Sequence, residues 1–207
     1  MTRSMASEGM GGEHARATFQ ALADALIPPM WRTNHAFCAR IVPGALHLDI
    51  DRYLMMQLDH SQFVPPGAEG AVLPLSISTA RLLDMGAEGL PPEGRLFSAL
   101  PRIDRLLALQ RLDRLHIPLS AAPPPFTDNP ALIRTIVNSL HQLTLFGYYS
   151  EWFGYGTTRL NAPQDRKLEW FPPGWSWSEY PGPSLGYRAL RGFVLKYPHR
   201  KGETSHG

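Results

Sequence analysis

The chain has 207 residues, a formal net charge of +2 at pH 7, 43% apolar residues and 18% charged residues. This length fits one main domain, and this apolar content can form a core, so the composition excludes a chain that is disordered throughout. The charge is too small to indicate nucleic-acid binding unless the basic residues form a cluster. Basic residues are concentrated only within 196–201, a pattern typical of a solvated tail.

Several classes of cofactor and membrane protein are excluded by the sequence. A single cysteine, Cys38, cannot form an internal disulfide, hold an iron–sulfur cluster or attach a c-type haem. No run of about 18 apolar residues is present, so no membrane-spanning helix is expected. Residues 1–12 contain neither a secretory apolar stretch nor paired arginines, which predicts a cytoplasmic location, with the periplasm as the alternative.

Three helices are expected in the first half of the chain. The first covers about 13–27 and ends at Pro28, because proline has no N–H to continue the helix. The second follows Pro43-Gly44 and ends near His60, and a short third helix is expected at 76–85. Apolar residues at helical spacing predict the buried stripe of the first helix: Phe19, Leu22, Ala23, Leu26 and Ile27.

Two more helices are expected before residue 148. One covers about 101–115, with an apolar stripe that predicts its buried face and an arginine-rich opposite face. The other begins at Pro130, capped by Asp128 or Asn129, and Gly147 is expected to end it. The stripe predicted for the helix at 101–115 consists of Ile103, Leu106, Leu107 and Leu115, and that for the helix at 130–147 consists of Leu132, Ile133, Ile136, Val137, Leu140 and Leu143.

The character of the sequence changes after Gly147. Residues 148–187 contain four of the five tryptophans and five of the seven tyrosines, with many glycines and prolines and no useful periodicity. Such a long irregular segment is uncommon inside a domain, and aromatic side chains at this density favour burial against something. The sequence therefore predicts a mainly α fold: a small bundle of about four to five helices with a long irregular C-terminal arm rich in glycine, proline and aromatic residues.

The expected organisation has four parts. Residues 1–12 form a flexible N-terminus, 13–147 the helical body, 148–195 the extended aromatic arm, and 196–207 a basic flexible tail. The arm is expected to pack on the body, on another chain, or on both. Core and interface are equally good interpretations of its aromatic residues, because tyrosine and tryptophan are common in both settings.

Three strings occur in a fixed order over residues 17–190. The first, at 19–28, reads Phe-x-x-Leu-Ala-Asp-x-Leu-Ile-Pro. The second, at 147–156, is Gly-Tyr-Tyr-Ser followed by a glycine-rich turn. The third, at 180–187, reads Tyr-Pro-Gly-Pro-Ser-Leu-Gly-Tyr. This ordered set resembles the gluconate 2-dehydrogenase subunit 3 family. The region 60–125 contributes nothing to the resemblance.

The resemblance implies a non-catalytic small subunit without a cofactor of its own. Such a subunit stabilises and assembles with a large FAD-dependent dehydrogenase of the glucose–methanol–choline type that acts on a sugar, a sugar acid or a related alcohol, and some complexes add a cytochrome subunit. Many relatives carry a twin-arginine export signal, which residues 1–12 lack. The residues expected at the partner interface are Tyr148, Tyr149, Trp152, Tyr155, Trp175, Tyr180, Pro181 and Tyr187.

Two other functions stay open from the residues alone. The first is a metal- or carboxylate-dependent hydrolase on a helical scaffold. Its candidate groups are His35 with Cys38, His47 with Asp51, or Ser150 and Glu151 with His141. Each set lacks either the further metal ligands or the Gly-x-Ser-x-Gly elbow that such chemistry needs. A nucleic-acid or membrane-surface binder would use the basic tail and the arginines of 102–114. Neither nucleic acid nor membrane insertion is expected in the leading interpretation.

Overall fold

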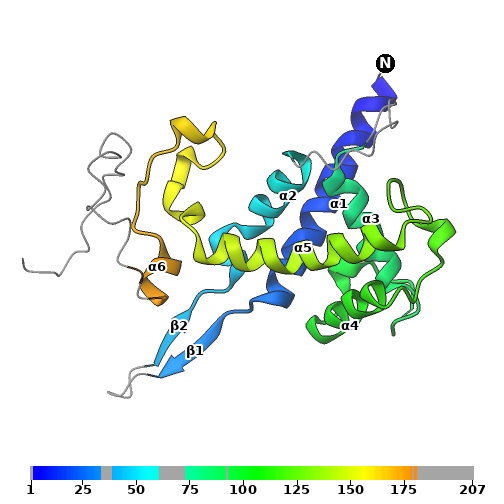
Figure 1. Cartoon of the computed structure of the whole chain (residues 1–207), viewed down its shortest axis with the longest axis horizontal. Helices are drawn as coiled ribbons and strands as arrows, with labels where there is room; N and C mark the ends of the chain where they lie inside the picture. The colour runs from blue at the N-terminus through cyan, green and yellow to red at the C-terminus, as the bar shows by residue number, and fades with distance from the viewer. Residues whose placement is uncertain (1, 34–38, 61–72, 92, 179, 181–207) are drawn as a thin grey trace, which may run out of the picture. The chain divides into compact units, whose positions relative to one another are not determined.

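The computed structural model of the chain describes residues 2–33, 39–60, 73–91, 93–178 and 180, with the backbone alone at 2–10, 32–33 and 39–40. The described part is mainly helical and contains one two-stranded sheet, which confirms the predicted fold class (Figure 1). It divides into two compact units, residues 1–144 and 145–207. The division falls within helix α5 (Pro130–Tyr149).

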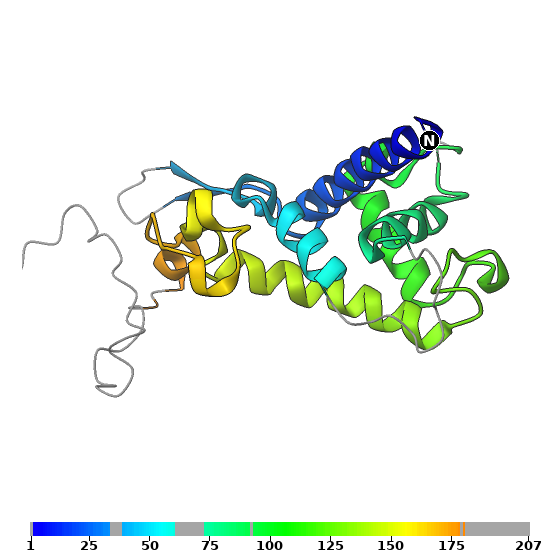
Figure 2. The ribbon, with the colours of Figure 1, turned by 90° about the horizontal axis from the view of Figure 1, so that it is seen from above.

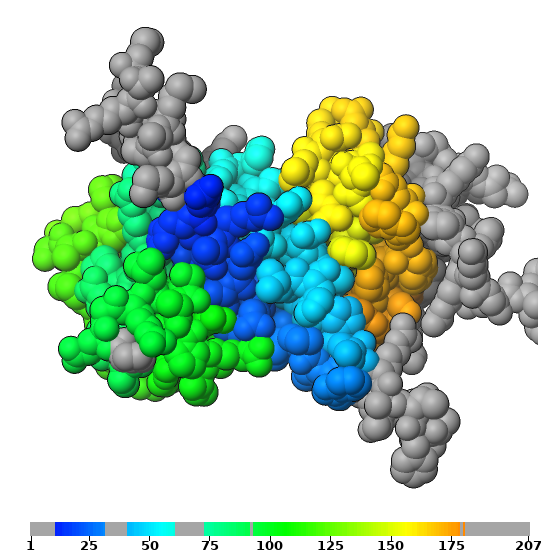
Figure 3. Space-filling model, turned by 180° about the vertical axis from the view of Figure 1, so that it is seen from behind, coloured from blue at the N-terminus to red at the C-terminus, as the bar shows by residue number. Residues whose placement is uncertain are grey.

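The first helix is the central element of unit 1. Helix α1 (Thr2–Leu26) contacts α2 (Ile50–His60), α3 (Leu75–Ala87) and α4 (Arg102–Asp113). In the space-filling view of Figure 3, the blue surface of α1 lies between the green segment around α4 and the cyan segment of α2. The predicted stripe is buried at Phe19, Leu22 and Ala23, so α1 supplies much of the core of this unit.

The first helix begins earlier than the sequence pattern indicated. We expected a flexible N-terminus over residues 1–12, whereas the structure describes helix from Thr2 onward. The apolar periodicity starts only after Glu13, which is why that pattern did not predict these turns. Their methionine, alanine and glutamate residues are favourable helix formers, and these offset the cost of the glycines among them.

A β-hairpin that the sequence analysis did not predict follows α1. Strand β1 (Met30–Thr33) pairs antiparallel with β2 (Ala39–Val42), and Met30 lies opposite Val42 (Figures 1 and 2). Strands of four residues are too short for a period-two pattern to stand out from the surrounding sequence. His35 and Cys38, considered as half of a metal site, lie outside the described residues.

The second predicted helix is divided in two. A 3-10 helix, Ala45–Leu48, ends at Asp49, which has left-handed backbone angles (φ 54°), and α2 then begins at Ile50. His47 and Asp51 therefore do not share one continuous helical face, which removes the geometry expected for a His–Asp pair. His47 is exposed and Asp51 is buried.

The buried face of α4 differs from the predicted one. Ile103, Leu106 and Leu107 are exposed, and the helix instead buries Ala108, Leu109 and Leu112. The physical reason is close packing between small residues of two helices. A Cβ atom on Gly86 of α3 would lie only 2.9 Å from the Ala108 carbonyl oxygen, so glycine is needed where α3 and α4 approach each other.

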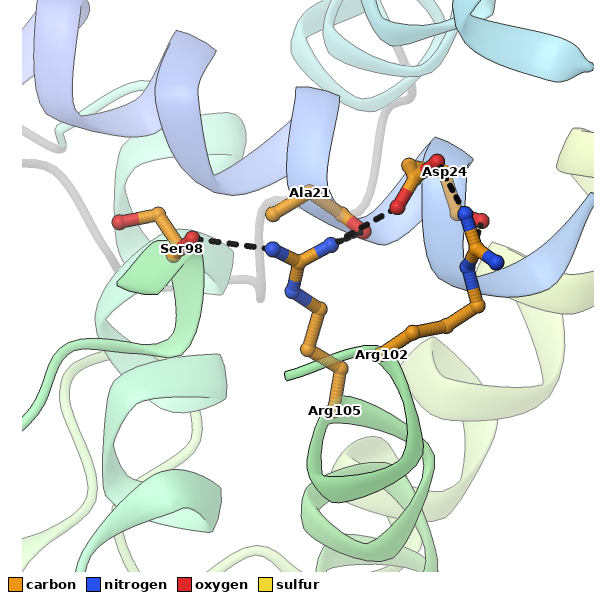
Figure 4. Close-up of polar contacts among 5 residues, drawn as sticks. All are labelled: Ala21, Asp24, Ser98, Arg102 and Arg105. Atoms are coloured by element: carbon orange, nitrogen blue, oxygen red, sulfur yellow. Dashed lines mark hydrogen bonds and ion pairs between the residues drawn. The ribbon is translucent and has the colours of Figure 1, made fainter. Parts of the chain in front are cut away.

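A polar network also fixes the orientation of α4 (Figure 4). The Asp24 carboxylate of α1 accepts hydrogen bonds from Arg102 Nη2 at 2.8 Å and from Arg105 Nη1 at 3.1 Å. Arg105 also donates to the carbonyl oxygens of Ala21 and Ser98, at 3.2 Å each. Ser98 belongs to a 3-10 helix, Phe97–Ala99. An arginine that the sequence pattern assigned to the solvent-facing side thus ties three elements together.

Helix α5 begins as predicted but ends later. Another 3-10 helix, Leu119–Ala121, lies in the segment before it. Asn129 Oδ1 accepts a hydrogen bond from the Leu132 N–H at 3.1 Å, which confirms Asn129 as the N-cap before Pro130. Of the predicted stripe, Ile133, Ile136, Val137 and Leu140 are buried, whereas Leu132 and Leu143 are half-buried.

Gly147 does not end this helix, which continues to Tyr149. The N–H of Ser150 still donates to the Phe146 carbonyl at 2.9 Å. The Ser150 hydroxyl then donates to the Gly147 carbonyl at 3.0 Å and accepts from the Trp152 N–H at 3.2 Å. A side-chain cap at Ser150 therefore stops the helix, in place of the glycine.

Candidate partner-binding surface

Unit 2 has a small core of its own. Its described residues begin with the last turn of α5 and continue through a 3-10 helix, Trp152–Thr158, a second one, Pro163–Asp165, and the short helix α6 (Pro173–Trp177). The arm was expected to lack regular structure, so these short helices correct that expectation. The buried core side chains of this unit are Tyr148, Trp152, Leu168 and Trp175.

Backbone hydrogen bonds fold the arm back on itself. The Gly154 carbonyl accepts from the N–H groups of Glu169 and Trp170, at 2.8 and 3.1 Å. Nearby, Glu169 accepts hydrogen bonds from both the backbone and the hydroxyl of Thr157, and these bonds lower the pKa of its carboxyl. These contacts hold the 3-10 helix at 152–158 beside residues 169–170 without a strand ladder.

A close approach at Gly174 joins α6 to the end of α5. A Cβ atom on Gly174 would lie 2.6 Å from the Tyr148 carbonyl oxygen and 2.7 Å from the Tyr149 Cα. The ring of Tyr148 packs on Trp177, with ring centroids 5.1 Å apart. Only glycine lets the two backbones come this close, so the glycine and the aromatic residues of the arm act together.

Residues at the end of α5 and in and after α6 line a cavity of about 580 Å³, which we call the aromatic pocket. One wall is formed by Trp175 and Tyr180, whose rings meet edge to face at 5.1 Å. The Tyr180 N–H donates to the Trp175 carbonyl at 2.9 Å, so the backbone holds this pair of rings in place. The described residues that line the pocket are Phe146, Tyr149, Ser150, Glu151, Trp175, Ser178 and Tyr180.

Glu151 is the one charged side chain among the described residues of this lining. The Tyr155 hydroxyl donates to its Oε1 atom at 3.1 Å. Burial raises the pKa of Tyr155 to about 12, and the negative charge of Glu151 and this hydrogen bond act in the same direction. The tyrosine therefore stays protonated as a donor across the physiological range, which orients the carboxylate.

Of the four described rings that line the pocket, Trp175 is buried and the other three are exposed. Phe146 is 66% exposed, Tyr149 49% and Tyr180 45%. Trp170 of the same unit is also half exposed. Large aromatic side chains gathered at the surface of one small unit are typical of protein-interaction sites.

The structure separates the eight residues expected at a partner interface into groups. Tyr148 and Trp152 are buried in the core of unit 2, whereas Tyr149 and Tyr180 are about half exposed and line the aromatic pocket. Trp175 belongs to both groups, because it is buried and also lines the pocket. Tyr155 is half-buried, bonded to Glu151 and covered by the Arg166 guanidinium 5.9 Å from its ring centre. The remaining two, Pro181 and Tyr187, lie outside the described residues.

The sequence analysis did not include Phe146 and Glu151 in the expected interface. Phe146 was missed because the helix was expected to end at Gly147, which placed the residue in the body. Glu151 was considered only as part of the hydrolase alternative. If the helix is continued to Tyr149, Phe146 and Tyr149 lie one turn apart on the same face. This spacing is the sequence signal from which the pair could have been predicted.

Two of the side chains considered for hydrolysis, Ser150 and His141, contact the backbone of α5. The Ser150 hydroxyl is engaged in the helix cap, and Nδ1 of His141 lies 2.9 Å from the Val137 carbonyl oxygen of its own helix. Within the described residues, no group of three or more histidine, cysteine, aspartate or glutamate side chains is placed to hold a metal ion. These contacts give no support to the hydrolase alternative.

Unit 1 has a separate cavity of about 210 Å³ between α2, α3 and α5. Its lining includes Leu58, Leu75, Phe126 and Ile136, and its described residues carry no ionisable side chain. The described lining of this cavity therefore offers no group for acid–base chemistry. The aromatic pocket combines rings with a carboxylate, so it is the stronger candidate site.

None of the helices in the described residues has the length and apolar character needed to cross a membrane. Comparisons with protein-family models, with curated proteins and with solved structures find no match to this chain.

Proposed function

We propose that this chain is a non-catalytic small subunit that binds and stabilises a large FAD-dependent dehydrogenase of the glucose–methanol–choline type. The dehydrogenase acts on a sugar, a sugar acid or a related alcohol and carries the FAD, whereas this chain holds no cofactor. A cytochrome subunit is an optional third component of such a complex. The observation that carries the proposal is the set of exposed rings that line the aromatic pocket: Tyr149 from the second of the three ordered strings, Tyr180 from the third, and Phe146 just before the second.

Two lines of argument support this proposal. The first is the resemblance of the strings at 19–28, 147–156 and 180–187 to the gluconate 2-dehydrogenase subunit 3 family. The second is the chemistry of the surface, because tyrosine and tryptophan dominate the residues that contribute most to protein association. Tyr149 and Tyr180 offer large rings that lose little side-chain freedom on binding.

The test is co-expression of the tagged chain with the glucose–methanol–choline-type dehydrogenase encoded beside it in its genome. We expect both proteins to elute together after affinity purification and size exclusion, with one FAD per copy of this chain. The dehydrogenase expressed alone should be less soluble or less stable than in the complex. Separate elution of the two proteins, or a genome that encodes no such dehydrogenase, would contradict the proposal.

A further inference from the structure

We propose that the aromatic pocket receives an arginine side chain of the dehydrogenase subunit, with Glu151 as its ion-pair partner. This inference rests on the proposed function and specifies the chemistry by which the same surface recognises its partner. It places a charged contact at the centre of an otherwise aromatic interface.

The charge of the pocket is the first argument for a basic occupant. Glu151 carries the one charge among the described lining residues, and Ser150 and Ser178 are neutral. The exposed rings of Tyr149 and Tyr180 line the same pocket, and the face of an aromatic ring carries the negative side of its quadrupole, which attracts cations. Both contributions have the same sign, so the pocket favours a positively charged group over a neutral or an acidic one.

The orientation of Glu151 is the second argument. The Tyr155 hydroxyl holds its Oε1 atom at 3.1 Å, while Tyr155 itself is packed beneath Arg166. A carboxylate that is already oriented loses less freedom when it binds a cation. Each carboxylate oxygen has two lone pairs, so Oε1 can keep this bond and still accept from a guanidinium.

The exposure of the rings indicates a protein rather than a free small cation. Phe146, Tyr149 and Tyr180 are about half exposed or more. A small cation would leave these rings and the carboxylate in contact with water, where such contacts are weak. A protein surface that covers the rings would remove this water and strengthen the attraction between Glu151 and the bound cation.

Arginine fits the pocket better than lysine. Its planar guanidinium can stack on a ring face while its N–H groups form two parallel bonds to one carboxylate. The pocket offers both partners, because the half-exposed ring of Tyr180 and the carboxylate of Glu151 line the same cavity. The compact ammonium of lysine gains less from the flat rings.

The test compares the wild-type chain with Glu151→Gln for binding to the purified dehydrogenase at low and high salt. Glutamine keeps the size of the side chain and an acceptor for Tyr155, so the fold of unit 2 should be retained. We expect at least about a tenfold loss of affinity at low salt, because an arginine would be left unpaired in the interface. The affinity of the variant should also depend less on salt than that of the wild type.

Asp165→Asn provides the matched control, since it removes one negative charge from an exposed site in the same unit outside the pocket. This control should bind within about twofold of the wild type. Equal or tighter binding by Glu151→Gln, while Tyr149→Ala still weakens the complex, would refute the arginine contact and leave the proposed function standing. A wild-type chain that does not bind the dehydrogenase would overturn both.

Discussion

Tyr148 and Tyr149 are neighbours in the chain, and their rings meet edge to face with centroids 5.1 Å apart. The exposed fraction of Tyr149 is nevertheless about ten times that of Tyr148. Tyr148 is 5% exposed and packs on Trp177, whereas Tyr149 is 49% exposed and lines the aromatic pocket. The helical backbone turns about 100° per residue, so adjacent side chains on α5 point to different sides. One of the two is core and the other is surface.

This difference predicts opposite effects for two otherwise identical substitutions. Tyr148→Ala should lower the free energy of unfolding of unit 2 by about 3–5 kcal/mol, as for other buried aromatic residues. Tyr149→Ala should cost only about 0.5–1.5 kcal/mol, mainly from the lost ring pair. Denaturant unfolding followed by tryptophan fluorescence measures both, since four of the five tryptophans lie in unit 2. Equal losses for the two variants would contradict the assigned roles.

Gly174 should not tolerate a larger residue, because the atoms closest to it belong to the backbone of α5. Gly174→Ala places a Cβ atom 2.6 Å from the Tyr148 carbonyl oxygen, so the backbones of α5 and α6 must separate. We expect a loss of about 1–3 kcal/mol in the fluorescence-detected transition, as for other overpacked sites.

The matched control is Gly12→Ala in α1, where nothing lies within 4 Å of the added atom. That variant should gain roughly 0.5–1 kcal/mol, because alanine favours the helix over glycine. A Gly174→Ala protein as stable as the wild type would show that α6 does not approach α5 as described.

The buried carboxyl of Asp51 should lower the free energy of unfolding as the pH rises above the ordinary pKa of aspartate. The side chain is 2% exposed, and burial raises its pKa above 3.8, with a smaller contribution from the charge of Asp49. The backbone N–H of Arg52 and the charges of Arg16 and Arg52 oppose this shift. Between the ordinary pKa and the raised one, the native state binds more protons than the unfolded state, so stability falls with increasing pH.

Asp51→Asn should therefore stabilise the protein at pH 7 relative to wild type, and the difference should shrink below the ordinary pKa of aspartate. Urea unfolding at a series of pH values, followed by far-ultraviolet circular dichroism, measures this change. Glu93→Gln, which removes an exposed charge, should show no comparable dependence. A stabilisation that is the same at every pH would refute the role assigned to the Asp51 charge.

The two arginines around Asp24 should contribute unequally to stability. Arg105 is 16% exposed and Arg102 46%, although both donate to the same carboxylate. A double-mutant cycle of Asp24→Ala with Arg105→Met should give a coupling of roughly 1–2 kcal/mol. The cycle with Arg102→Met should give about 0.2–1 kcal/mol, as is usual for a solvated pair. A larger coupling to Arg102 would contradict the network described for α1 and α4.

Local signals in the sequence predicted some elements well. The Asn129-Pro130 pair marked the start of α5, because both the cap and the fixed φ of proline act within one turn. The face of α4 could not be predicted in the same way. Its apolar stripe was clear, but the close approach of Gly86 and Ala108 and the pairing of Arg105 with Asp24 rotate another face inward. Both contacts join residues far apart in the chain.

The sequence predicted only part of the candidate site, because burial too depends on contacts between residues far apart in the chain. Aromatic density marked the right segment, and Tyr149, Trp175 and Tyr180 do line one pocket. Density alone could not separate the exposed Tyr149 and Tyr180 from the buried Tyr148 and Trp152, because these two pairs differ in tertiary burial and not in aromatic character. Because α5 continues to Tyr149, Tyr148 and Tyr149 are both helical and point to different sides of the helix.

The most direct test of the central claim is size exclusion of this chain mixed with the FAD-dependent dehydrogenase encoded beside it, with protein and flavin absorbance recorded together. The account predicts one peak that contains both proteins and one FAD per copy of this chain. Tyr149→Ala should weaken this association at least thirtyfold, or about 2 kcal/mol, while the circular dichroism spectrum stays that of the wild type. Two separate peaks for the wild-type proteins, or a flavin that elutes with this chain alone, would contradict it.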